Sequence, residues 1–256
     1  MSFLSELLES TGARVAEARA LVSEEVLEQR VAAAEPPRRF AAALTTPATA
    51  VIAEIKRATP SRGDLDLDLD TRKLAAAYRD GGAAAISVLT EPDRFKGSLE
   101  DLAAAREVGL PVLRKDFIID PWQILEARAW GADAVLLIVR INGDEFETLV
   151  KTTASLGMDA LVEVYDENDL ERAAVAGASL IGINNRDLET FEVDPDRTRR
   201  LAPLVPDGAT VVALSGVTTR PEVEALAAAG ADAVLVGESL VTAEDPAAKL
   251  RELTGA

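Results

Sequence analysis

The chain has 256 residues, and 27 lysines and arginines stand against 44 aspartates and glutamates, which gives a formal net charge of −17 at pH 7. Hydrophobic residues make up 48% and aromatic residues 4%, so we expect a folded chain with an aliphatic core. The acidic balance argues against nucleic acid as a partner, because such binding needs a basic surface. Cysteine and histidine are absent, which excludes disulfides, thiolate nucleophiles, imidazole bases and most zinc sites. Acid–base chemistry must therefore use lysine, aspartate, glutamate or tyrosine.

Neither a signal peptide nor a membrane span is predicted. The first residues include early glutamates and lack the basic-then-apolar pattern of a signal peptide. The longest apolar run lies around Ala134–Val139, far short of the roughly 20 residues that a membrane helix needs. We therefore expect a cytoplasmic protein with no membrane partner.

A helical segment is predicted to precede the rest of the chain. Pro36 and Pro37 interrupt its periodicity, since proline breaks a helix interior. We interpret residues 1–47 as a helical extension packed on a catalytic domain of residues 48–256, with a partly mobile arm as the alternative. The predicted helices are Phe3–Ser10, Ala13–Ala34 and Phe40–Leu44.

Eight short apolar runs follow, and alanine- and leucine-rich amphipathic runs separate them. Each apolar run is rich in valine, isoleucine or leucine, as is typical of strands buried on both faces. The predicted strands are Ala50–Lys56, Ala84–Thr90, Val112–Phe117, Ala134–Val139, Ala160–Tyr165, Leu180–Asn185, Thr210–Ser215 and Ala233–Gly237. The predicted helices include Thr71–Asp80, Leu99–Val108, Trp122–Trp130, Asp144–Leu156, Glu167–Ala176 and Arg220–Ala229. The glycines expected to end helices in the left-handed conformation are Gly81, Gly109, Gly131, Gly157, Gly177 and Gly230.

The strict alternation of strand and helix predicts the α/β class with a parallel sheet. Eight units favour closure into a TIM (β/α)8 barrel with an N-terminal helical extension. A doubly wound sheet is the alternative, because alternation alone does not show closure.

Polar and charged residues stand where the predicted strands end, which is where such barrels carry their catalytic groups. Side chains alternate along a strand, so Glu54 and Lys56 share one face, as do Asn184 and Arg186. A structural layer of ion pairs across the barrel mouth would explain any one of these residues. It is a poor explanation for polar and charged residues at six strand ends at once.

Two lysines and one glutamate are the candidates for proton transfer. Lys56 and Lys115 could donate protons or hold an anion, and a Schiff-base lysine is the alternative. Glu163 lies in an apolar run and is the candidate general base, or else a structural partner for a lysine across the barrel.

Glycine-containing loops follow the last two strands. Glycine lets backbone N–H groups approach an anion, and a following helix N-terminus adds its positive end. Loops at these two positions are the usual phosphate site of such barrels. We therefore expect phosphate to be bound by the loops that contain Gly216, Gly237, Glu238 and Ser239.

Five motifs spread over nearly the whole chain match one known family. They are Glu54–Ser61 followed by Arg62-Gly63, Ser87–Glu91, Leu113–Asp120, Leu161–Val164 and Ile181–Leu188. Together they resemble indole-3-glycerol phosphate synthase. The resemblance implies a TIM-barrel carboxy-lyase of tryptophan biosynthesis with no cofactor and no metal. Its reaction converts 1-(o-carboxyphenylamino)-1-deoxyribulose 5-phosphate into indole-3-glycerol phosphate, with loss of carbon dioxide and water.

The resemblance also implies a role for each candidate residue. Lys115 would protonate the substrate carbonyl as the aromatic carbon attacks it, and Glu163 would handle protons in the later dehydration. Lys56 would hold an anionic group, while Glu54 and Asn184 would orient the substrate. The further implied substrate contacts are Arg186, Ser215, Phe117 against the aromatic ring, and Ser61.

Four positions depart from the family pattern. Leu214 stands where the family usually has a glutamate, and Tyr165 stands where histidine is common. Thr59 and Arg62 keep the hydroxyl and the charge of the usual serine and lysine. Either the enzyme works without that glutamate, or the altered pocket serves lysine- or carboxylate-based chemistry on another substrate.

The expected partner is a small phosphorylated substrate. A protein that binds such a ligand without turning it over is a further alternative, though the retained acid–base residues speak against it. We expect a monomer, and the resemblance also allows association with other tryptophan-pathway enzymes.

Overall fold

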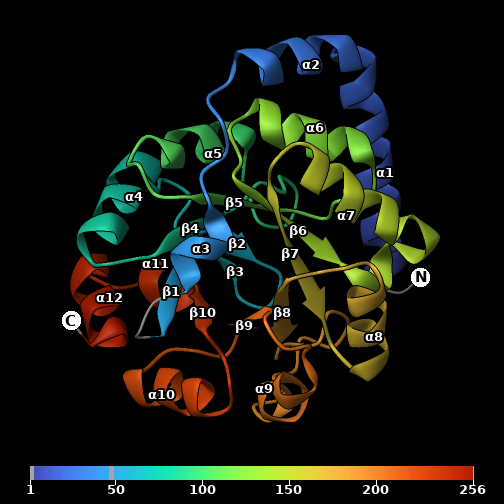
Figure 1. The fold of residues 1–256 in the computed structure, drawn as a ribbon. Helices are drawn as coiled ribbons and strands as arrows, with labels where there is room; N and C mark the ends of the chain where they lie inside the picture. Colours follow the sequence, from blue (N-terminus) through green and yellow to red (C-terminus); the bar gives the residue numbers. More distant parts are fainter. Residues whose placement is uncertain (1–2, 46–48, 256) are drawn as a thin grey trace.

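The computed structural model describes residues 3–45 and 49–255, and eight parallel strands form a closed barrel in it (Figure 1). The first strand, β1, pairs with both the second and the last strand of the barrel, so the sheet has no free edge. This closure confirms the TIM barrel and rules out the doubly wound sheet. In barrel order the strands are β1 (Ala50–Ile55), β10 (Ala233–Val236), β9 (Thr210–Leu214), β8 (Leu180–Asn184), β7 (Asp159–Val164), β6 (Ala134–Ile138), β5 (Val112–Lys115) and β4 (Ala85–Leu89).

The alternation of side chains along each strand divides the core into two layers. Ile52, Leu113 and Leu161 belong to the cluster that fills the barrel interior. Val51 and Ile55, on the other face of β1, belong to the larger cluster between strands and helices. Because both faces are packed, the barrel strands are almost wholly apolar until they reach their carboxyl ends.

Each strand is followed by helical structure that covers the outside of the barrel (Figure 1). None of the helices in the described part of the chain is long and apolar enough to cross a bilayer. The helices are α4 (Thr71–Asp80), α5 (Leu99–Arg106), α6 (Pro121–Ala129), α7 (Phe146–Ser155), α8 (Glu167–Val175), α9 (Arg197–Leu201), α10 (Arg220–Ala228), α11 (Glu238–Val241) and α12 (Pro246–Thr254). Short 3-10 turns occur at Val139–Ile141, Gly143–Glu145 and Ala202–Leu204.

The expected left-handed glycines are present with one exception. Gly109, Gly131, Gly157, Gly177 and Gly230 all have φ between 72° and 102°. The prediction for Gly81 is wrong, since its φ is −83° and the next residue, Gly82, has φ 92°. Gly81 is needed for packing instead, because a Cβ there would lie 2.9 Å from the carbonyl oxygen of Ala247 in α12.

Three N-terminal helices contact the barrel domain, the first near the carboxyl ends of the strands and the third near their amino ends. They are α1 (Phe3–Leu21), α2 (Glu24–Ala33) and α3 (Phe40–Leu44). The predicted break before Ala13 is wrong, because α1 runs through it, and the predicted helix over 13–34 is instead interrupted before Ser23, the N-cap of α2. Helix α2 packs on α6, and the backbone N–H of Ala41 in α3 donates to Asp159 at the start of β7. The predicted boundary between residues 47 and 48 lies outside the described residues.

The loop after β1 contains a small hairpin that the sequence pattern does not predict. It consists of β2 (Ala58–Thr59) and β3 (Gly63–Asp64), paired antiparallel. The turn between them includes Pro60, and Gly63 adopts φ 74°. The hairpin places Thr59 and Pro60 at the mouth of the barrel.

Candidate active site

A cavity of about 190 Å³ lies at the carboxyl end of the barrel. Its walls come from strand ends and loops around the whole barrel, which is why residues far apart in sequence meet there. The predicted residues from the strands and their ends that line it are Glu54, Lys56, Lys115, Phe117, Glu163, Asn184 and Arg186. Those from the last two loops are Ser215, Gly216, Gly237, Glu238 and Ser239.

Ser61 is the one predicted site residue that does not line this cavity. It is exposed in the turn of the hairpin, with its Oγ 3.3 Å from Oγ1 of Thr59. Its substrate contact therefore stays a prediction.

Glu54 lies between the two candidate lysines. Its Oε1 is 3.0 Å from Nζ of Lys56, and its Oε2 is 3.8 Å from Nζ of Lys115. Burial by itself would raise the pKa of Glu54, but the two ammonium groups outweigh it and lower the pKa below the ordinary value. Glu54 is therefore ionised and holds both lysines at one wall of the cavity.

Glu163 and Asn184 meet through a third side chain, Tyr165. The Tyr165 hydroxyl donates to Oε1 of Glu163 and accepts from Nδ2 of Asn184 at 3.3 Å. Within the described residues, the buried Oε2 of Glu163 has no hydrogen-bond partner. Oε2 is thus the oxygen of Glu163 whose hydrogen-bonding capacity is unused in this structure.

Arg186 is tied into the same wall by its backbone and its side chain. Its N–H donates to Oδ1 of Asn184 at 3.0 Å, and its Nη1 donates to the carbonyl oxygen of Phe191 at 2.8 Å. These bonds fix the guanidinium at the rim of the cavity.

The two loops expected to bind phosphate lie side by side at the cavity. Ser215 and Gly216 have φ values of 67° and 81°, so two successive residues are left-handed. Gly237 is the N-cap of α11. Across the mouth, Nη1 of Arg62 lies 2.5 Å from Oε1 of Glu238, which connects the hairpin after β1 to the loop after β10.

Apolar side chains form another part of the wall. Phe117 packs against Phe95, with ring centroids 6.3 Å apart. Leu214 is 1% exposed and lies over Gly182, where a Cβ would come within 2.9 Å of its Cδ1. The leucine at the usual glutamate position therefore makes this wall apolar, as the sequence predicts.

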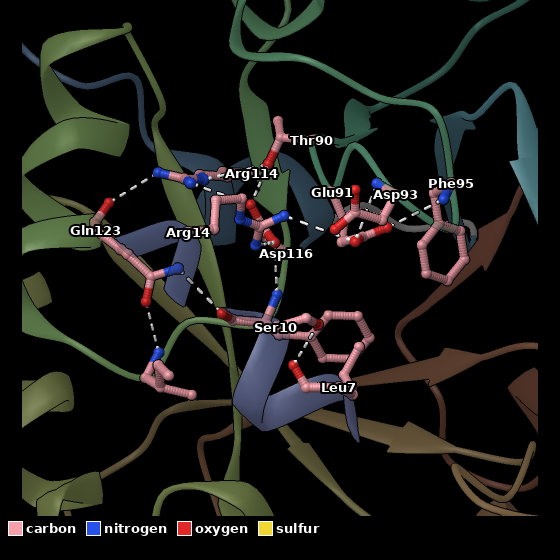
Figure 2. A network of polar contacts seen from close by, with 12 residues as sticks. Leu7, Ser10, Arg14, Thr90, Glu91, Asp93, Phe95, Arg114, Asp116 and Gln123 are labelled. Atoms are coloured by element: carbon pink, nitrogen blue, oxygen red, sulfur yellow. Dashed lines mark hydrogen bonds and ion pairs between the residues drawn. The ribbon is translucent and has the colours of Figure 1, made fainter. Parts of the chain in front are cut away.

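An ion-pair network connects α1 to Asp116, the residue that follows Lys115 at the end of β5 (Figure 2). Nη2 of Arg14 lies 3.0 Å from Oδ1 of Asp116, and its Nη1 lies 3.6 Å from Oε1 of Glu91. Asp116 is also bound by Arg114 at 3.0 Å, and these cations lower its pKa against the opposing effect of burial. Neither Arg14 nor Asp116 is predicted from the sequence as a site residue, although the charged run at the end of β5 indicates that this strand end is polar.

No group of three or more acidic side chains that could hold a metal ion occurs among the residues that the structure describes. The cavity is lined by both ammonium groups and carboxylates, side chains that can donate and accept protons.

Comparison with known proteins identifies the family. A family model described as indole-3-glycerol phosphate synthase matches residues 4–253. Curated indole-3-glycerol phosphate synthases of Mycolicibacterium smegmatis and Mycolicibacterium gilvum are each 52% identical over 255 residues, 99% of this chain and 94% of the relative. Among solved structures, thiamine phosphate pyrophosphorylase from Pyrococcus furiosus is similar in fold alone, with a TM-score of 0.60 at 20% identity over 80% of this chain and 93% of that one.

These relatives share the activity that the motifs imply, and they do not favour the alternative of another substrate for the altered pocket. The protein is thus a carboxy-lyase of tryptophan biosynthesis that acts on a small phosphorylated substrate. The chain belongs to the indole-3-glycerol phosphate synthase family.

Proposed function

We propose that Lys115 is the general acid of the ring closure and that Glu163 handles the protons of the dehydration that follows. The observation that carries this proposal is that Lys115, Lys56, Glu54 and Glu163 come from three different strand ends and line one cavity. Groups that must act on one molecule need this convergence.

The first step joins the aromatic carbon that bears the carboxylate to the carbonyl carbon of the sugar chain. The carbonyl oxygen gains an electron pair as this bond forms, and Lys115 supplies the proton that makes it a hydroxyl. Carbon dioxide then leaves with its bond broken toward the ring, which restores aromaticity. Lys56 holds the anionic carboxylate before it departs.

The second step removes water. The new hydroxyl must leave with a proton, and a proton must be lost from the substrate so that the double bond of the five-membered ring forms. Glu163 accepts the second of these protons, and Lys115, which water has reprotonated after the first step, donates a proton to the departing oxygen. Glu54 and Asn184 orient the substrate amine and hydroxyls.

The remaining cavity residues bind the two ends of the substrate. Phe117 packs against the aromatic ring, and Arg186 supports the anionic groups near it. We place the phosphate at the left-handed turn of Ser215 and Gly216 and at the start of α11, with Gly237, Glu238 and Ser239.

The test is the growth of indole fluorescence when the carboxyphenylamino-deoxyribulose phosphate is added to the protein. Lys115→Ala should lower kcat by about 10²–10⁴, the usual contribution of a general acid. Lys151→Ala is the matched control, because Lys151 is exposed in α7 and pairs only with Glu147 among the contacts described. Unchanged turnover in Lys115→Ala would remove its assigned role, and tight product binding without turnover by the unmodified protein would favour a binding function.

We further propose that the protein acts in the cytoplasm as a monomer, with residues 1–47 as an extension of the barrel domain. The acidic composition, the packing of α2 on α6 and the contacts of Arg14 and Val15 of α1 with the barrel domain support this arrangement. Sedimentation of the purified protein at the mass of one chain is the expected result, and association with other tryptophan-pathway enzymes would appear as a larger species in their presence.

A further inference from the structure

The hydroxyl of Tyr165 lies behind the candidate base rather than in the cavity. Tyr165 follows β7 and is 4% exposed, while Glu163, two residues earlier, lines the cavity. The hydroxyl contacts Glu163 on one side and Asn184 on the other. It therefore connects two residues of the proposed mechanism without touching the substrate itself.

The two hydrogen bonds of the Tyr165 hydroxyl run in the same direction, from Asn184 through the phenol to Glu163. Burial raises the pKa of Tyr165 well above its ordinary value, and the charge of Glu163 adds to the effect, so the phenol keeps its proton. A carboxylate can only accept, so the phenol donates to Glu163. Oδ1 of Asn184 accepts from the Arg186 N–H, which leaves Nδ2 of Asn184 to donate to the phenol oxygen.

The ring of Tyr165 is held by two arginines. The guanidinium carbon of Arg140 lies 4.1 Å from the ring centroid, and that of Arg197 lies 5.6 Å from it. Arg140 is bound to Asp169 at 3.0 Å, and Asp169 also accepts from the backbone N–H of Tyr165 at 3.0 Å. Arg197 donates to the carbonyl oxygen of Asn184 at 2.5 Å. The phenol oxygen is therefore fixed by contacts that do not depend on its own hydrogen bonds.

We propose that Tyr165 is a positioning residue that couples Glu163 to Asn184 through its hydroxyl. The hydroxyl occupies Oε1 of Glu163 and so fixes the orientation of the carboxylate, whose Oε2 is unpartnered among the described residues. This inference rests on the role proposed above for Glu163.

The direct test is Tyr165→Phe, which removes the hydroxyl and keeps the ring between its two arginines. We expect kcat to fall by about tenfold to a hundredfold, the usual effect of losing a hydrogen bond to a charged group, while KM changes by less than about threefold. Thr153→Val is the matched control, because Thr153 of α7 is fully buried away from the cavity and its hydroxyl donates to a backbone carbonyl, that of Leu149, at 2.8 Å. A kcat of Tyr165→Phe equal to that of the control would overturn the proposal.

A double-mutant cycle separates positioning from a general structural role. If Tyr165 acts through Glu163, adding Tyr165→Phe to Glu163→Gln should lower kcat by less than about twofold. If the two losses multiply, Tyr165 supports the barrel independently of Glu163 and the proposal is wrong.

A spectroscopic measurement decides the coupling even if Tyr165→Phe does not fold or the unmodified protein shows no turnover. The chain has two tyrosines, so the Tyr78→Phe protein grown with 3-fluorotyrosine carries its label at Tyr165 alone. Glu163→Gln should shift the fluorine resonance, whereas the exposed change Glu147→Gln should leave it in place. An unshifted resonance in Glu163→Gln rejects the coupling, and absent turnover of the unmodified protein with a shifted resonance rejects only the proposed function.

Discussion

At Gly237 the backbone passes so close to the Glu54–Lys56 pair that a side chain has no room. A Cβ there would lie 2.5 Å from Oε1 of Glu54 and 3.0 Å from Nζ of Lys56. Both atoms are the ends of side chains, so an added methyl group would displace the Glu54–Lys56 pair rather than the backbone. Glycine at this position is thus needed for the geometry of the Glu54–Lys56 pair as well as for the loop that we propose binds phosphate.

We predict that Gly237→Ala lowers kcat/KM by about tenfold or more, because small displacements of catalytic groups are costly. The melting temperature should change by only a few degrees. Gly12→Ala is the control, since Gly12 lies in α1 and a Cβ added there would have no neighbour within 4 Å. Alanine at this position should stabilise the helix by about 0.5–1 kcal/mol with unchanged activity. Full activity in Gly237→Ala would show that the Glu54–Lys56 geometry is not critical.

The residues of the site can be predicted to the extent that strand geometry fixes them. Glu54 and Lys56 share a face because side chains alternate with a period of two, and both line the cavity. The link from Glu163 to Asn184 through Tyr165 could not be predicted, because it depends on side-chain rotamers. Nor could the contact of Arg14 with Asp116, since these residues are separated by 102 positions and meet only when α1 docks (Figure 2).

The elements that follow β1 are connected by one buried carboxylate, Asp101 of α5. Nη2 of Arg57 donates to it at 2.8 Å, Oγ1 of Thr71 at 2.5 Å and Oγ of Ser98 at 2.9 Å. Burial acts to raise the pKa of Asp101, but these hydrogen bonds and the charge of Arg57 lower it overall. The loop after β1 and the starts of α4 and α5 are thereby held together next to the hairpin.

We predict that Asp101→Asn lowers the free energy of unfolding at pH 7 by about 2–4 kcal/mol, as expected when one partner of a buried ion pair is removed. A carboxyl group with a lowered folded-state pKa stabilises the protein above its unfolded pKa, and this contribution is lost as the pH falls through the folded value. Urea unfolding curves of the variant and the unmodified protein should therefore differ most at neutral pH. They should approach each other as the pH falls below about 4, the ordinary pKa of an aspartate in an unfolded chain. Glu147→Gln, in an exposed pair, should change stability by less than about 0.5 kcal/mol, and a pH-independent difference for Asp101→Asn would contradict the assignment.

The elements themselves are predicted well where a long apolar run or a glycine marks them. The strands begin within two residues of their predicted starts because buried parallel strands read as continuous Val, Ile and Leu runs. The hairpin of β2 and β3 is missed, since two-residue strands carry no periodic signal. The predicted break in the N-terminal helices is misplaced. Gly12 suggests that a helix ends there, but α1 continues through this glycine because the helix is stabilised by its packing on the barrel.

Trp122 lies at the contact between the N-terminal extension and the barrel domain, so its fluorescence reports on this contact. Trp122 and Leu125 of α6 form one cluster with Val15 of α1 and Leu27 of α2. Trp122 is 3% exposed, and the chain has one other tryptophan, Trp130, directly after α6. Tryptophan fluorescence therefore reports the environment of this interface, whereas far-ultraviolet circular dichroism reports the helices of the entire chain.

We predict that the two signals change together in urea. The barrel is closed by its first and last strands, and the extension contributes two fully buried side chains, Leu7 and Phe40, to the inner cluster of the barrel. Coincident transitions are the mark of a single cooperative unit. Leu27→Ala removes the side chain that α2 places against Trp122, and it should move both midpoints to lower urea by an amount that corresponds to about 2–4 kcal/mol. Val26→Ala, at an exposed position of the same helix, should leave both midpoints nearly unchanged. If fluorescence changed at lower urea than circular dichroism, residues 1–47 would be a separately melting arm, and the barrel of residues 48–256 would be stable without them.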